Sequence, residues 1–308
     1  MDKKSLNLEQ IKAIIPEPPL LDSIELDGNK CIATKKFRKD ESFFKGHFPA
    51  QPVVPGVLLV RAFAQLGIIA HKSSEESKSV VLSGIHKARF KNPVHPDDEL
   101  VFTLEKTIKD TWQGQATLNG DLACVVELSF APSLSPQTTE LDIESQNALP
   151  NPLNVEEVKM IIPHRPPFLF VDKVIKLDIG KECITEKTFG KNDYFFNECS
   201  PENNTVPSEL IVEAAAQAGA IPVLVVEENK GEIAFFATIT NAVFHKQVHL
   251  GEKVVLTTKM DKIHGFAGTG HSLAIVNGEP VFEAEIMFAL PKTREHDNSA
   301  HQTPAVYR

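Results

Sequence analysis

Two long stretches of the chain, residues 56–70 and 208–226, are apolar at nearly every position rather than along one face. Helices with this pattern are buried on all sides. A proline, Pro55 or Pro207, stands directly before each stretch and marks a helix start. We therefore predict two long buried helices, and we expect Pro222 to bend the second one or to end it early.

Alternating apolar and polar residues with β-branched content follow each predicted helix and indicate strands. These segments are residues 80–90, 99–108 and 112–131 after the first helix, and 233–245, 253–263 and 266–290 after the second. An Asn-Gly pair inside the last segment of each set signals a tight hairpin. One helix held by an antiparallel sheet is an α+β arrangement, and this chain contains the pattern twice.

The two patterns are copies of one unit. Residues 58–65 read LLVRAFAQ and residues 210–217 read LIVEAAAQ. Each copy opens with an asparagine, Asn7 or Asn154, followed three residues later by Gln or Glu, which is typical of the capped start of a short helix. Since the matching segments occur in the same order throughout, the sequence predicts a tandem repeat.

Four segments follow from this repeat. The predicted units are residues 1–132 and 153–291. The segment between them, residues 133–152, is rich in Ser, Pro, Thr and Asn and is expected to be a linker. Residues 292–308 are polar without an apolar period and are expected to form a frayed tail.

Composition narrows the class of protein. The chain has 308 residues, with 32 Lys and Arg against 41 Asp and Glu, a formal net charge of -9. Nucleic acid is therefore not an expected partner. We expect no membrane span, because no run approaches the roughly 18 apolar residues that a span needs, and no signal peptide is recognisable. The 4 cysteines include no Cys-x-x-Cys pair, which favours a reduced, cytoplasmic protein.

Three segments carry a resemblance to a known family. Residues 43–58 read FFKGHFPAQPVVPGVL, residues 162–172 read IPHRPPFLFVD, and residues 84–94 read GIHKARFKNPV. The first closely resembles the active-site segment of the 3-hydroxyacyl-acyl-carrier-protein dehydratases of fatty acid synthesis, and the others are similar to further segments of that family. The resemblance implies the hotdog fold, a long central helix wrapped by a curved antiparallel sheet, here as a tandem double hotdog.

The resemblance also implies a composite site. Family sites combine a His from one hotdog with a Glu or Asp on the central helix of the other. The first unit has His47 but carries Arg61 at the carboxylate position, whereas the second has Glu213 but carries Cys199 at the His position. One intrachain site is therefore expected to keep both catalytic groups, His47 and Glu213, and the other is expected to be inactive.

These residue types suit a dehydration. Neutral imidazole is a suitable base for the C2 proton of a 3-hydroxyacyl thioester. Burial is expected to raise the pKa of Glu213, which then holds a proton for the C3 hydroxyl or positions that hydroxyl or a water. Free N–H groups at a helix start stabilise a developing enolate. We expect Gly56 and Val57 at that start, and Gln217 one turn from Glu213, to contact the substrate.

Other interpretations of single residues stay open. His164 is expected to cap or pack the end of the short helix. Metal binding by His245 and His249 is a weak alternative, as is Cys199 acting as a nucleophile activated by Arg61. Three basic residues are expected on a solvated strand edge, or in a patch for an acidic acyl carrier protein: Lys87, Arg89 and Lys91.

The function that we expect is dehydration of 3-hydroxyacyl thioesters on acyl carrier protein to trans-2-enoyl thioesters, without metal or cofactor. The expected assembly is an intrachain pseudo-dimer. Alternatives within the fold are an acyl-CoA hydratase, a thioesterase and a non-catalytic acyl-binding subunit, because fold alone does not determine function.

Overall fold

The structure is a computed structural model that describes residues 3–15, 17–74, 79–107, 111–134, 149, 151–196, 204–264 and 267–290. Most of the predicted linker, the whole predicted tail and Cys199 lie outside these ranges. Within them, no helix is long and apolar enough to cross a membrane.

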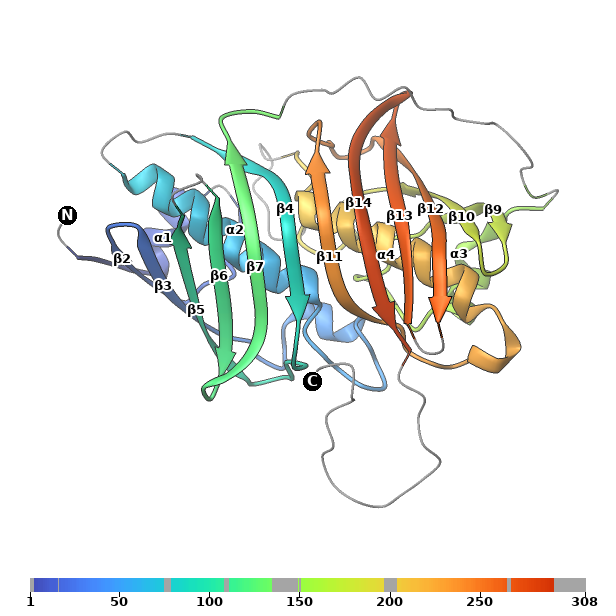
Figure 1. Cartoon of the computed structure of the whole chain (residues 1–308), viewed down its shortest axis with the longest axis horizontal. Helices are drawn as coiled ribbons and strands as arrows, with labels where there is room; N and C mark the ends of the chain where they lie inside the picture. The colour runs from blue at the N-terminus through green and yellow to red at the C-terminus, as the bar shows by residue number, and fades with distance from the viewer. Residues whose placement is uncertain are drawn as a thin grey trace, which may run out of the picture.

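One antiparallel sheet of 14 strands runs through the described chain (Figure 1). The first half of the chain contributes β1 Lys4–Asn7, β2 Ser23–Asp27, β3 Lys30–Lys36, β4 Val81–Phe90, β5 Glu99–Lys106, β6 Trp112–Leu118 and β7 Asp121–Ala131. The second half contributes β8 Leu153–Asn154, β9 Lys173–Asp178, β10 Glu182–Thr188, β11 Phe235–Phe244, β12 Lys253–His264, β13 Ala267–Val276 and β14 Glu279–Ala289.

The strand order repeats the symmetry of the sequence. It reads β1-β2-β3-β5-β6-β7-β4 and continues β11-β14-β13-β12-β10-β9-β8, so that equivalent strands stand at equal distances from the β4–β11 junction. At that junction Ile239 lies opposite Ala88, and Ala242 lies opposite Ile85. The two halves thus share one continuous sheet through backbone hydrogen bonds.

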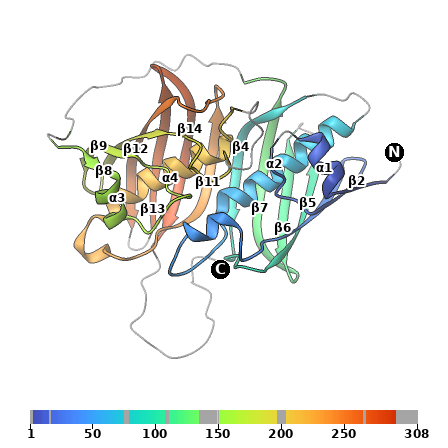
Figure 2. The ribbon, with the colours of Figure 1, turned by 180° about the vertical axis from the view of Figure 1, so that it is seen from behind.

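Both long helices lie on the same side of this sheet (Figures 1 and 2). Helix α2 spans Gly56–Ser73 and helix α4 spans Ser208–Leu224. Nearly all of their residues are buried, as the uniformly apolar sequence predicts. Pro222 lies inside α4 and does not end it early.

The short helices begin at the predicted caps. Helix α1, Leu8–Ile14, and helix α3, Val155–Ile161, each start with a complete capping box, formed by Asn7 with Gln10 and by Asn154 with Glu157. Two 3-10 helices complete the described set, η1 at Ser42–Lys45 and η3 at Glu227–Asn229.

The Asn-Gly hairpins form where they were predicted. Asn119 and Gly120 join β6 to β7 with positive φ angles of 52° and 91°, and the equivalent pair between β13 and β14 has 53° and 82°. Two successive positive φ angles match the right-handed twist of the strands.

The expectation of a strand edge at Lys87 and Arg89 was wrong. Their strand, β4, lies in the middle of the sheet between β7 and β11. Both side chains are nevertheless exposed, because the face of β4 that points away from the core is open to solvent. The alternating pattern predicted the polar face correctly but carries no information on neighbouring strands.

Candidate active site

The loop between η1 and α2 fixes the ring of His47. The His47 backbone N–H donates to the carbonyl of Phe43 at 2.9 Å, and its carbonyl accepts from Val53 N at 3.1 Å. The ring Nδ1 lies 3.0 Å from the Val53 carbonyl oxygen. Because a carbonyl only accepts, Nδ1 carries the hydrogen of a neutral ring, and Nε2 keeps the free lone pair.

Gly46 lets this loop contact the second half of the chain. Arg165 N donates to the Gly46 carbonyl at 3.0 Å. A Cβ on Gly46 would stand 2.9 Å from the backbone nitrogen of Phe168, closer than side chains pack. The His47 loop therefore docks directly against the loop that follows α3.

Helix α4 supplies the carboxylate of Glu213 and the amide of Gln217. Both side chains are buried, and one helical turn separates them. Gln217 Nε2 donates to Glu213 Oε1 at 2.9 Å and to the Phe168 carbonyl at 3.1 Å, while its Oε1 accepts from Phe170 N at 2.7 Å. The other carboxylate oxygen, Glu213 Oε2, has no hydrogen-bond partner among the described residues.

His164 belongs to this cluster, which corrects the expectation that it caps or packs the end of α3. Its Nε2 lies 3.4 Å from Glu213 Oε1, and its ring centroid lies 5.4 Å from that of His47. The ring also packs edge-on against Phe48 at 4.9 Å. His164 therefore contacts groups from both halves of the chain.

The site holds a neutral base beside an ionised acid at neutral pH. Burial lowers the pKa of His47 from 6.5 to about 4, although the charge of Glu213 acts in the opposite direction. Burial also acts to raise the pKa of Glu213, but the His164 hydrogen bond, the charges that His47 and His164 can carry, and the Gln217 hydrogen bond lower it below its ordinary value. The predicted upward shift at Glu213 was wrong, since sequence shows burial and not these donors.

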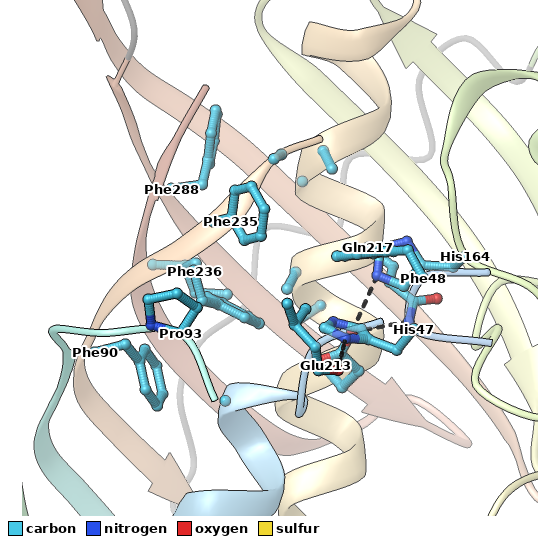
Figure 3. Close-up of a pocket in the computed structure, with 18 of the residues that line it drawn as sticks. His47, Phe48, Phe90, Pro93, His164, Glu213, Gln217, Phe235, Phe236 and Phe288 are labelled. Atoms are coloured by element: carbon cyan, nitrogen blue, oxygen red, sulfur yellow. Dashed lines mark hydrogen bonds and ion pairs between the residues drawn. The ribbon is translucent and has the colours of Figure 1, made fainter. Parts of the chain in front are cut away.

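A cavity connects this polar cluster to an apolar channel (Figure 3). The polar end is lined by His47, His164, Glu213 and Gln217. The apolar end runs between the small residues Ala216, Gly219 and Ala220 of α4 and the aromatic rings of Phe90, Phe235, Phe236 and Phe288. A mostly apolar lining with a few convergent polar groups is typical of small-molecule binding sites.

The three residues expected to contact substrate occupy different environments. Gly56 lines the cavity at the start of α2, where a Cβ would stand 2.8 Å from the Phe90 ring. No side chain caps this helix start, and Leu58 N donates to the Pro55 carbonyl at 3.0 Å, so the N–H groups that precede Leu58 are the candidates for contact with a ligand. Gln217 also lines the cavity, although its amide is already bonded to protein. Val57 is fully buried and is not part of the cavity lining.

The residue equivalent to Glu213 on α2 is Arg61, and it forms an ion pair. Arg61, only 1% exposed, donates from Nη2 to Glu17 Oε2 at 2.8 Å, and its guanidinium carbon lies 3.8 Å from the centre of the Phe195 ring. Nearby, burial raises the pKa of Glu209 to about 7 despite the opposing charge of Arg61. The suggested role of Cys199 falls outside the described residues.

Among the described residues, one group of three side chains has donor atoms close enough together to ligate a metal: His47, His164 and Glu213, all within 4.8 Å of one another. In the structure, His164 Nε2 lies 3.4 Å from Glu213 Oε1, and the rings of His164 and His47 pack edge-on. The pair His245 and His249 is not part of such a group, and His245 Nε2 instead lies 3.1 Å from Glu283 Oε1.

Each half of the chain matches a known protein family. Residues 23–126 match the family of ApeI-like dehydratases, and residues 162–287 match the FabA-like domain. The 3-hydroxyacyl-[acyl-carrier-protein] dehydratase FabZ of Bacillus thuringiensis is 47% identical over 143 residues, which make up 99% of that relative and 46% of this chain. FabZ of Bacillus mycoides gives the same identity and coverage.

Solved structures with a similar fold span both halves. The dehydratase domain of RzxB from Pseudomonas fluorescens superposes with a TM-score of 0.66 at 15% identity, covering 88% of this chain and 98% of that one. A trans-AT polyketide synthase dehydratase domain from Brevibacillus brevis reaches 0.68 at 9% identity, with 88% and 98% coverage. These neighbours agree with the double-hotdog fold, and the sequence relatives show that the chain belongs to the 3-hydroxyacyl-[acyl-carrier-protein] dehydratase family.

Proposed function

We propose that this chain dehydrates 3-hydroxyacyl thioesters carried by acyl carrier protein to trans-2-enoyl thioesters, at a single site built by both halves. The observation that carries the proposal is the cluster itself. His47 arrives from the first half, Glu213 and His164 arrive from the second, and an apolar channel opens beside them. In this proposal the halves form an intrachain pseudo-dimer, and the chain acts in the cytoplasm.

In the proposed mechanism His47 is neutral and Glu213 is ionised before the reaction, and the proton taken from C2 is later given to the leaving hydroxide. His47 Nε2 takes the C2 proton, and the first-turn N–H groups of α2 near Gly56 stabilise the enolate oxygen. Glu213 Oε2 accepts a hydrogen bond from the C3 hydroxyl and aligns it. The C3–O bond then breaks, the imidazolium gives its proton to the departing hydroxide, and water leaves with the C2–C3 double bond formed.

The inactivity proposed for the second position has a chemical basis. The guanidinium of Arg61 has N–H donors and no acceptor, so it cannot accept a hydrogen bond from a hydroxyl. Its ion pair with Glu17 and its contact with Phe195 also occupy the space around the helix. We therefore expect each chain to convert one substrate molecule at a time, at the site that contains His47 and Glu213.

Mass spectrometry of a 3-hydroxyacyl-acyl-carrier-protein after incubation with the protein tests the proposal directly. We expect loss of one water from the acyl chain. Release of free carrier with a hydroxy acid would instead indicate a thioesterase, and tight binding without conversion would indicate an acyl-binding subunit. Running the same acyl chain on coenzyme A, in both directions, distinguishes the hydratase alternative.

A further inference from the structure

Glu213 has one oxygen held twice and one oxygen held by no described residue. Oε1 accepts from Gln217 Nε2 at 2.9 Å and lies 3.4 Å from His164 Nε2, whereas Oε2 has no partner in the described part of the chain. Both nitrogens lie against Oε1 and no described residue lies within hydrogen-bond distance of Oε2, so the two carboxylate oxygens are held differently. The asymmetry determines which oxygen faces the cavity.

The first half of the chain contains an equivalent set of hydrogen bonds around Gln65, the counterpart of Gln217. Gln65 accepts from Leu20 N at 2.7 Å, as Gln217 accepts from Phe170 N at 2.7 Å. Each glutamine then donates to a backbone carbonyl, Pro18 at 3.0 Å or Phe168 at 3.1 Å, and to one carboxylate, Glu17 at 3.0 Å or Glu213 at 2.9 Å.

The two sets of hydrogen bonds differ in which position carries the carboxylate, the central helix or the loop after the short helix. In the second half the carboxylate is on the helix, Glu213, and its partner in the loop is His164. In the first half the helix carries Arg61, and the residue that takes the place of His164 after the short helix is Glu17. The loop residue therefore changes together with the helix residue, which indicates that His164 is matched to Glu213 and is not merely a residue of the loop.

We propose that His164 is a positioning residue for Glu213: its Nε2–H and the Gln217 amide hold Oε1, so that Oε2 is the oxygen presented to the substrate hydroxyl. The ring is itself held by aromatic contacts with His47 and Phe48 from the other half. His164 thereby sets the carboxylate relative to the base. The inference rests on the proposed dehydration, because it assigns a task within that site.

Three substitutions of His164 separate positioning from simple packing. Gln places an amide N–H near the position of Nε2, Asn is too short to reach it, and Leu has none. We expect the Leu and Asn variants to lose kcat by about 10²-fold with little change in KM, since a small misplacement of a catalytic group costs that much. The Gln variant should recover most of this loss.

The pH profile is the second measurement. Loss of His164 removes one of the causes that lower the pKa of Glu213, so that pKa should rise. The acid-side fall of kcat/KM should then move to higher pH in the Leu and Asn variants and return in the Gln variant. His245→Leu is the control, because it removes another buried histidine that contacts a carboxylate, that of the partly exposed Glu283, outside the site. It should leave kcat and the pH profile unchanged.

Two results would overturn the proposal: wild-type kcat and pH profile in His164→Asn, or a Gln variant no better than the Asn variant. Thermal unfolding of each variant shows whether lost activity follows lost structure, and equal unfolding temperatures for Gln and Asn make their comparison decisive. A wild-type protein that does not remove water would contradict the proposed function, whereas active wild type with indifferent His164 variants contradicts only the positioning role.

Discussion

At the scale of single residues, the two proposed catalytic groups are each expected to be required for turnover. His47→Ala removes the imidazole that we propose as the base for the C2 proton. Glu213→Gln replaces the carboxylate that aligns the C3 hydroxyl with a neutral amide. Each change is expected to lower kcat by about 10²-fold or more with the fold retained. Steady-state rates and circular dichroism of the purified variants check this.

Cys199→Ala serves as the comparison for those two variants, because it tests the alternative nucleophile. It should keep activity close to wild type. A fully active His47→Ala protein with a native circular dichroism spectrum would rule out His47 as the base.

The ionisation of His47 predicts the acid limb of the pH profile. Its pKa is lowered to about 4, so the ring stays neutral and basic down to that pH. As pH falls through about 4 the ring becomes protonated and kcat/KM should fall, whereas between pH 5 and 8 this group causes no change. Initial rates across that range, with unfolding monitored at each pH, provide the measurement, and a limb centred near 6.5 would contradict the buried environment.

The proximity of His47 and Glu213 was predictable from sequence, whereas the position of His164 beside Glu213 was not. The first two stand in distinctive surroundings, a Gly- and Pro-rich loop and an otherwise apolar helix. His164 stands among turn-forming residues, and its partner Glu213 is distant in sequence, so local pattern favoured a helix cap. The available signal was the exchange of Glu17 and Arg61 for His164 and Glu213 between the two repeats.

At the scale of elements, docking of the His47 loop against the loop after α3 should determine activity. Gly46→Ala puts a Cβ 2.9 Å from Phe168 N, so the loop must move away from the second half. We expect this variant to lose about 10²-fold in kcat with little effect on the helices, because His47 is displaced from Glu213.

Gly190→Ala is the control for that substitution. A Cβ there meets no atom within 4 Å, and its φ is not positive, so the variant should behave as wild type. Equal activity of both alanine variants would mean that the loop contact is not required.

Elements built from local signals were predicted well. The capping boxes, both long helices and both Asn-Gly hairpins follow from neighbouring residues. The order of strands does not, because pairing of β4 with β11 joins segments far apart in sequence. That is why Lys87 and Arg89 were assigned to an edge, although their strand lies at the centre of the sheet.

At the scale of the whole molecule, the sheet is symmetric but the proposed number of active sites is one. The sheet is symmetric about the β4–β11 junction, yet the two equivalent positions on α2 and α4 carry opposite charges, Arg61 and Glu213. A symmetric pair of hotdogs has two sites, whereas this chain is proposed to have one. Duplication within one chain allows each copy to lose a different catalytic group while the pair keeps a complete set.

Counting covalent adducts per chain tests this claim most directly. A mechanism-based acetylenic thioester, which alkylates imidazole after its α-proton is removed, is incubated with the full chain, and adducts are counted by intact mass and located by peptide mapping. We expect one adduct per chain, at His47, and suppression of labelling in Glu213→Gln. Two turnover-dependent adducts per chain, or a dominant adduct at Cys199, would contradict the single composite site.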